Sequence, residues 1–287
     1  MIQATFELAT TATQRVVRAL DGARTPAAQH VFTQLYADAA RDVAQHCDKE
    51  LQAGRNLGAL HGVCLTIKDN LDVAQETTMA GSVVCAGEAP ARRDAPVVQR
   101  LRDAGAVILG KTNMSEFAFS GVGINPHHGT PTNPADTSQA RVPGGSSSGA
   151  AVAVALGLSE VGIGTDTGGS IRIPAALCGL VGYKSTQTRI PRTGVMELSR
   201  TLDTVGSITR SVRACLAVDA VMSQQALPTD AAPLRGLRFA VPQTLMMDDV
   251  DAIVAHAFER TLRRLAAAGA QVVEIPFQAL GDIAALS

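Results

Sequence analysis

The sequence predicts an α/β fold in which a mixed, largely parallel and twisted sheet is flanked by helices. Short apolar runs that end in Gly, Pro, Asn or Asp alternate with stretches in which apolar residues recur at helical spacing. Alternation of this kind favours parallel strand pairing. Five runs have the character of buried strands: residues 63–70, 106–113, 160–166, 237–242 and 271–276.

Two helices are expected before the first of these strands, within residues 10–53 and separated by a break at Thr25 and Pro26. The apolar face of the first comprises Val16, Val17 and Leu20, and that of the second comprises Val31, Leu35, Ala39, Val43 and Leu51. We therefore expect residues 1–54 to form a helical segment that packs on the core of an α/β domain formed by residues 55–287.

Helical spacing returns between the predicted strands. The apolar positions are Val97, Val98 and Leu101 within residues 95–104, and Ile253, Ala257, Leu262 and Leu265 within residues 249–268. The last residues begin a similar pattern with Leu280, Ile283 and Leu286. This pattern stops with the chain, so we expect the C-terminal part of the usual domain to be missing.

Composition and charge are those of a globular protein and weigh against a nucleic-acid partner. Of the 287 residues, 46% are hydrophobic and 18% are charged, so the chain can bury a large core. The 25 basic residues are spread among 26 acidic ones, which gives a net charge of −1. With no basic face and only 3% aromatic residues, no direct binding of nucleic acid is expected.

The cysteines and the apolar runs indicate a cytoplasmic protein. The five cysteines are widely spaced and include no Cys-x-x-Cys pair, so they predict neither a disulfide framework nor a zinc site. The sequence has no cofactor motif either, and we expect no metal and no cofactor. Because the N-terminus lacks a signal-peptide pattern and the longest apolar run is only residues 149–158, no membrane association is expected.

Residues 141–157, "RVPGGSSSGAAVAVALG", contain the first of two glycine and serine clusters. Such a composition is typical of flexible linkers. Here, however, Pro143 precedes the cluster and an apolar helix is expected after it, so both ends are anchored and the glycines permit tight backbone geometry. A phosphate-binding loop is disfavoured, since neither G-x-x-x-x-G-K-[ST] nor G-x-G-x-x-G is present.

The second cluster, "GTDTGGSIRIPAALCG", follows a predicted strand. The backbone amides of Thr167, Gly168 and Gly169 could converge beside Ser170, as an oxyanion hole requires. The alternative is a Gly-Gly turn with a serine that caps a helix, which is the commoner meaning of such a string. The G-x-S-x-G pattern of α/β hydrolases is absent.

A nucleophilic serine needs a base. None of the six histidines lies in a recognisable triad context, so a lysine whose pKa is lowered by burial is the alternative. Lys68 stands at the end of the apolar strand "CLTIKDN", where a lysine is costly unless it is used or paired. Ion pairing with Asp69 or another carboxylate is the structural alternative for this residue.

Several long motifs, agreeing in order and spacing, resemble the amidase signature family. They are "LHGVCLTIKDNLDV", "TTMAGS", "DAPVVQRLRDAGAVILGKTNMSEFA", "VPGGSSSGAAVAVALG", "GTDTGGSIRIPAALCGLVGYKST" and "LDTVGSITRSV". The resemblance covers roughly residues 55–220. It implies an amidase-signature-type α/β fold and hydrolysis of a carboxylic amide to a carboxylate and ammonia or an amine.

The resemblance also implies a Ser–cis-Ser–Lys triad that works through an acyl-enzyme. Ser170 would be the nucleophile, Ser146 the bridging serine in a cis peptide, and Lys68 the base. The resemblance selects Ser146 over the serines that follow it, because it lies 24 positions before Ser170. The amides around Thr167, Gly168 and Gly169 would then hold the oxyanion.

Other positions receive supporting roles. Ser147 is expected to hold the relay by hydrogen bonding, and Asp166 to orient the oxyanion hole. Arg172 is expected to form a buried ion pair in preference to clamping a substrate. Ile173, three places after Ser170, favours an apolar or aromatic amide as the small-molecule substrate.

Two departures from the family pattern leave other interpretations open. Lys-Pro-Thr of the family is replaced here by Lys-Ser-Thr, with Ser185 as a tolerated turn change, and the family's domain is longer than this chain. One alternative is the glutamine-hydrolysing component of a tRNA-dependent amidotransferase, its A-type polypeptide, which would need partner subunits. Another is a non-catalytic, incomplete fragment that acts as a binding module. The resemblance also makes a homodimer possible.

Overall fold

The computed structural model describes residues 5–6, 9–226 and 233–284. The chain divides into two compact units, residues 1–227 and residues 228–287. The expected division of the chain after residue 54 stays a prediction.

The first unit is built on a six-stranded sheet with the order β1-β3-β2-β4-β6-β5. The strands are β1 (Phe32–Leu35), β2 (Cys64–Lys68), β3 (Val107–Thr112), β4 (Val161–Asp166), β5 (Val181–Lys184) and β6 (Thr204–Thr209). The central strand β2 runs parallel to both of its neighbours, β3 and β4, and the outer strands pair antiparallel. The predicted fold class is confirmed, with a parallel centre in a mixed sheet.

The three central strands were predicted correctly, but the edge strand β1 was not. Residues 32–35 were assigned to a helix because Val31 and Leu35 fit its apolar face. In the structure they pair with β3, and the backbone N–H of Tyr36 donates to Leu109 (2.9 Å) before the helix begins. Phe32 and Thr33 have a high strand propensity, and this pairing with β3 outweighs the local helical pattern.

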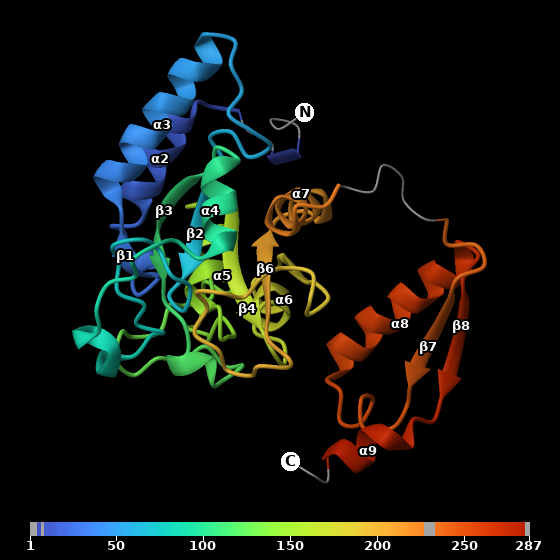
Figure 1. Cartoon of the computed structure of the whole chain (residues 1–287). Coiled ribbons are helices and arrows are strands. Elements are labelled where there is room, and N and C mark those ends of the chain that lie inside the picture. Colours follow the sequence, from blue (N-terminus) through green and yellow to red (C-terminus); the bar gives the residue numbers. More distant parts are fainter. Residues whose placement is uncertain (1–4, 7–8, 227–232, 285–287) are drawn as a thin grey trace. The chain divides into compact units, whose positions relative to one another are not determined.

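Helices cover both faces of this sheet (Figure 1). They are α2 (Ala12–Gly22), α3 (Ala37–Gln52), α4 (Pro96–Asp103), α5 (Ser148–Ala155), α6 (Arg172–Leu177) and α7 (Val212–Ser223). Short 3₁₀ turns lie at Pro26–Ala28, Val83–Gly87 and Glu116–Ala118. Thr11 and Gln14 form a capping box at the start of α2, which satisfies two of the free N–H groups there.

Alternation along β2 decides which helices lie on which face of the sheet. Leu65 and Ile67 belong to the apolar cluster that contains Val98 of α4 and Val218 of α7. Cys64, one position before Leu65, belongs to the cluster of α2 and α3, which lie side by side (Figure 1). Because successive strand residues face opposite sides, the side chain at position 68 leaves the sheet on the same face as Cys64.

Helix α5 is packed unusually close to the sheet. Residues 148–154 of this helix are buried, as expected for a helix that is apolar all round. Glycines in β4 allow the approach: a Cβ on Gly162 would lie 2.8 Å from the Ala150 oxygen, and one on Gly164 would lie 2.6 Å from Ser147 Oγ. The start of α5 is therefore held directly against the end of the central strands.

The second unit is a small β-α-β arrangement. Its strands β7 (Arg238–Pro242) and β8 (Gln271–Ile275) are parallel and are connected through α8 (Ala252–Ala267). The Asp251 side chain caps α8 by accepting the N–H of Ile253 (2.8 Å). Both strands and this helix were predicted. The last helix, α9 (Gln278–Ala284), contains Leu280 and Ile283, whereas Leu286 lies outside the described residues.

No helix in the described part of the chain has the length and apolarity needed to cross a membrane. The five cysteines are all buried and carry free thiols.

A buried ion pair joins β3 to the loop that follows β2. Lys111 Nζ lies 3.2 Å from Asp69 Oδ1, and both side chains are almost fully buried. The ammonium also donates to the Thr77 carbonyl oxygen (3.1 Å). Burial raises the pKa of Asp69, and the charge and hydrogen bond of Lys111 oppose that rise.

We expect Lys111→Met to lower the free energy of unfolding by about 3–5 kcal/mol, because it leaves the Asp69 carboxylate buried without a cation. The measurement is chemical denaturation. The double variant Lys111→Met/Asp69→Asn is the control and should recover most of the loss, since no buried charge remains. A loss below about 1 kcal/mol in the single variant would contradict this account of the pair.

Candidate active site

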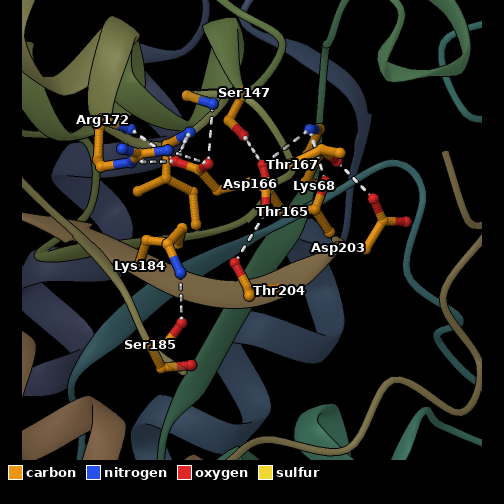
Figure 2. A network of polar contacts seen from close by, with 12 residues as sticks. Lys68, Ser147, Thr165, Asp166, Thr167, Arg172, Lys184, Ser185, Asp203 and Thr204 are labelled. Carbon is orange, nitrogen blue, oxygen red and sulfur yellow. Dashed lines mark hydrogen bonds and ion pairs between the residues drawn. The ribbon is translucent and has the colours of Figure 1, made fainter. Parts of the chain in front are cut away.

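Lys68 is the last residue of β2, and its side chain is fully buried. Its Nζ lies 2.7 Å from Ser146 Oγ and 2.8 Å from Thr165 Oγ1, with the Thr165 carbonyl oxygen at 3.5 Å. Figure 2 shows the amine directed at Thr165 across the ends of the strands. Among the ion pairs of the described residues, none includes Lys68.

The alternative interpretation of Lys68, as half of an ion pair with Asp69, is therefore wrong, because Asp69 pairs with Lys111. Desolvation by burial lowers the pKa of Lys68 from 10.5 to about 7, against the opposing charges of Asp166 and Asp203. A neutral amine is consequently available near neutral pH, and it lies within hydrogen-bond distance of a serine hydroxyl.

Ser146 lies at the entry to α5, and the Gly145–Ser146 peptide bond is cis. Neighbouring segments hold this turn: Ser115 N–H donates to the Ser146 carbonyl (3.1 Å), and Gly145 N–H donates to the Gly121 carbonyl (2.8 Å). Position 145 needs a glycine, since a Cβ there would lie 2.7 Å from the Gly123 backbone. The first glycine and serine cluster is thus an anchored turn and not a linker.

Ser170 is buried and ends the turn that follows β4. Its carbonyl oxygen accepts the N–H of Ser147 at 3.1 Å, which ties the two serine clusters together through the backbone. Among the hydrogen bonds of the described residues, none joins Ser170 Oγ to Ser146 Oγ. The structure therefore brings Lys68 and Ser146 into direct contact and places the Ser170 backbone beside them.

Asp166 organises the turn from which Ser170 projects. Its carboxylate accepts the N–H groups of Gly169 (2.9 Å), Ile171 (3.1 Å) and Arg172 (3.2 Å). Arg172 also binds both carboxylate oxygens with its guanidinium, at 3.0 and 2.8 Å (Figure 2). Burial alone would raise the pKa of Asp166, but the hydrogen bonds from Arg172 and the turn hold it below its usual value. The predicted ion pair of Arg172 is present, with the guanidinium about half exposed.

These contacts decide which amides remain available as oxyanion donors. The Gly169 N–H is already donated to Asp166. The amides of Thr167, Gly168 and Ser170 have no acceptor among the described residues. A Cβ built on Gly168 would meet no atom within 4 Å, so this residue faces open space.

Ser147 and Ile173 lie on opposite sides of this turn. Ser147 is fully buried and donates from Oγ to the Thr165 carbonyl (3.4 Å). Ile173 is partly buried, and its side chain lies over two glycines: Cβ atoms built on Gly169 and Gly144 would come within 2.6 and 3.1 Å of it. Ile173 thus packs against both serine-bearing segments.

Three buried residues of the site were not predicted from the sequence. Thr165 accepts hydrogen bonds from Lys68 and from Asn70 Nδ2 (3.1 Å). Asp203 accepts the hydroxyl of Thr167 and the N–H groups of the 198–199 segment (Figure 2). A signal for Asp203 exists, since it lies in the motif "LDTVGSITRSV", but the sequence does not indicate that this segment returns to the Ser170 turn.

A cavity of about 510 Å³ adjoins these residues. Four of its lining side chains are apolar, and two carry carboxylates: they are Phe117, Phe119, Ile124, Leu198, Glu116 and Glu197, with Ser115 and Ser120 completing the wall. Both walls connect to the site, because Ser115 bonds to Ser146 and Leu198 N–H donates to Asp203 (2.8 Å).

Within the described residues, no group of three or more His, Cys, Asp and Glu side chains is arranged to hold a metal ion.

The amidase family model matches residues 16–287 of the chain. The chain belongs to the amidase signature family. Solved members of the family share its fold. A crystal structure of an amidase superposes with a TM-score of 0.84 at 38% identity, covering 94% of this chain and 61% of the other. The peptide amidase from Stenotrophomonas maltophilia gives 0.81 at 36% identity, covering 96% and 60%.

Curated relatives within the family carry different activities in their names. A 2-amino-5-chloromuconic acid deaminase from Comamonas testosteroni is 43% identical over 241 residues, which cover 83% of this chain and 52% of the relative. The A-type polypeptide of the glutamyl-tRNA(Gln) amidotransferase from Acidothermus cellulolyticus is 41% identical over 263 residues, covering 86% and 52%. The chain spans about half the length of the curated relatives it matches.

We expect Lys68 to make stability depend on pH. With a pKa of about 7 in the folded chain and an ordinary lysine value of 10.5 in the unfolded chain, the unfolded chain binds more protons between these pH values, so stability rises with pH. From pH 7 to 9, the free energy of unfolding of the wild type should rise relative to Lys68→Met by about 1.4 kcal/mol per pH unit.

Denaturant titrations at each pH measure this difference. Lys49→Met, which removes an exposed lysine of α3, is the control and should follow the wild-type curve. Parallel curves for the wild type and Lys68→Met would mean that Lys68 keeps an ordinary pKa.

Proposed function

We propose that the chain forms the catalytic part of an amidase that hydrolyses a carboxylic amide through a Ser–cis-Ser–Lys relay. The observation that carries this proposal is the contact of 2.7 Å between the buried Lys68 Nζ and Ser146 Oγ, together with a Lys68 pKa of about 7. Membership of the amidase signature family supports the same chemistry.

In the proposed mechanism, neutral Lys68 takes a proton from Ser146 as Ser146 takes one from Ser170. Ser170 Oγ then attacks the amide carbonyl carbon and forms a tetrahedral intermediate. The proton returns through Ser146 to the nitrogen as the carbon–nitrogen bond breaks, releasing ammonia or an amine and leaving an acyl-enzyme. Water, activated by the same relay, hydrolyses this ester and restores Ser170.

The proposal requires Ser170 Oγ and Ser146 Oγ to meet when substrate is bound. Hydrogen bonds of catalytic groups are often long without substrate and tighten in the reacting complex. The backbone contact of 3.1 Å between Ser147 and Ser170 supports this step, since it keeps the two serine segments adjacent. A change of side-chain rotamer is then sufficient to close the relay.

The oxyanion is proposed to bind at the turn that precedes Ser170. The sequence-based candidates were Thr167, Gly168 and Gly169. Since Gly169 N–H is donated to Asp166, we propose that Thr167 and Gly168 donate to the oxyanion and that Gly169 holds the turn. The free N–H of Ser170 is a further donor.

An amide with an apolar or aromatic group and no negative charge is the proposed substrate. Phe117, Phe119 and Leu198 offer an apolar surface in the cavity beside Ser146, and Ile173 packs against the Ser170 turn. The ionisable lining residues, Glu116 and Glu197, would repel a carboxylate. A homodimer and a cytoplasmic location stay predictions.

The two alternative functions differ in what the isolated chain does. The hydrolysing component of a tRNA-dependent amidotransferase would release ammonia from glutamine and would work with partner subunits, but glutamine carries the α-carboxylate that this cavity disfavours. An incomplete fragment acting as a binding module would bind amides without turnover. Ammonia release from phenylacetamide by the chain alone favours the amidase.

We expect a fluorophosphonate probe to label Ser170 alone, because such a probe reacts only where base and oxyanion donors surround the serine. Intact mass and peptide mapping measure the adduct. Ser170→Ala should abolish labelling and amide hydrolysis, and Ser146→Ala and Lys68→Ala should each lower kcat/KM by about a thousandfold or more.

The matched control is Ser148→Ala. Ser148 is buried in the same cluster but bonds weakly to the Asn113 carbonyl (3.4 Å), so its removal should leave most of the activity. Labelling of a folded Ser170→Ala variant at the same rate as the wild type would remove Ser170 from the mechanism.

The pH dependence of kcat/KM should report the Lys68 amine. Because the neutral form is the base, activity should be full above the pKa of about 7 and fall about tenfold per pH unit below it. Initial rates with phenylacetamide from pH 5 to 9 measure the profile. An acid limb centred near pH 4, which is typical of a carboxylate, would identify a different base.

A further inference from the structure

Asp203 is a buried carboxylate that binds only uncharged donors. It directly precedes β6, and 3% of its surface is exposed. Its Oδ1 accepts the Thr167 hydroxyl and the Ser199 N–H (3.0 Å), and its Oδ2 accepts the Leu198 N–H (2.8 Å). Among the ion pairs formed by described residues, none involves Asp203.

The other buried acids near Lys68 have a cation of their own. Asp166 is bound on both oxygens by Arg172, and Asp69 is bound by Lys111. A buried charge without compensation is costly, so the environment of Asp203 must offset its charge in another way. Asp166 and Asp203 are the two charged groups whose fields favour the protonated form of Lys68.

The hydrogen bonds of Asp203 also join two walls of the site. Thr167 begins the turn that ends at Ser170, and Leu198 lines the cavity. Figure 2 shows the Asp203 carboxylate meeting Thr167 on the side of Lys68. One side chain thus fixes the position of the cavity wall relative to the proposed oxyanion donors.

We propose that Asp203 is a positioning residue of the active site, which locks the Thr167 turn to the cavity wall at 198–199 and supplies an uncompensated negative charge to Lys68. The proposal rests on the proposed amidase function for its kinetic consequences. Its electrostatic part concerns Lys68 alone and is measured without turnover.

Asp203→Asn is the informative change, because it preserves shape and removes the charge. One oxygen becomes an NH₂ group, so either the Leu198 bond or the pair of bonds on Oδ1 is lost. Without the carboxylate, the protonated form of Lys68 loses stabilisation, and the pKa of Lys68 falls below its wild-type value.

The first measurement is an NMR titration of Lys68 in protein labelled with ¹³C-lysine, with the signal assigned through Lys68→Met. We expect Asp203→Asn to move the Lys68 midpoint down by about half a pH unit or more. The control is Asp219→Asn, which removes an equally buried carboxylate that pairs with Arg189, and it should leave the midpoint unchanged. An unchanged midpoint in Asp203→Asn overturns the electrostatic part; Asp203→Ser replaces that variant if it does not fold.

The second measurement compares phenylacetamide, which reaches the cavity, with acetamide, which does not. Asp203→Asn should lower kcat/KM for phenylacetamide at least about threefold more than for acetamide, because the cavity wall is released. Thr167→Val removes only the hydroxyl on the turn, so it should lower kcat for both amides alike without moving the Lys68 midpoint, and Thr167→Ser should restore activity.

Equal losses for both amides in Asp203→Asn would overturn the positioning part. If the wild type hydrolyses neither amide, the proposed function fails, and the NMR titration still decides whether Asp203 acts on Lys68.

Discussion

The site depends on the burial of one amine that has hydroxyl groups, and no carboxylate, within hydrogen-bond distance. Ser146 and Thr165 lie within 2.8 Å of Lys68 Nζ, and the pKa of the amine is about 7. Holding it at this value below neutral pH costs the fold about 5 kcal/mol relative to an exposed lysine. A carboxylate in contact would remove much of that cost, but it would also keep the amine protonated and useless as a base.

The backbone around Lys68 is arranged to bring neutral oxygen atoms to it. Gly162 and Gly164 leave room for α5 to approach β4, and Gly145 allows the turn before α5 to lie against Gly123. The same close packing sets the Ser147 N–H on the Ser170 carbonyl. The glycines of both clusters therefore serve contact between segments and not flexibility, which is why larger side chains at these positions would separate the two serines.

The sequence predicts the centre of this fold better than its edges. Strands β2, β3 and β4 are continuous apolar runs because both their faces are buried, and such runs are visible without a structure. Strands β5 and β6 include glycine and polar residues, and β1 forms only by pairing with β3, so their formation depends on partners distant in sequence. The same limit applies to the site: motifs pointed to Lys68, Ser146 and Ser170, whereas Thr165 and Asp203 depend on contacts across the sheet.

The two buried lysines of neighbouring strands show how environment separates structure from chemistry. Lys111 on β3 and Lys68 on β2 are both fully buried. Lys111 lies 3.2 Å from the Asp69 carboxylate, which fixes its charge and makes it a structural cation. Lys68 has Asp166 and Asp203 acting on it only through their fields, and Arg172 already binds the first of these. The balance at Lys68 is thus between desolvation and the one carboxylate that no cation among the described residues neutralises. Asp203 therefore lies where a change of charge alters the base most directly.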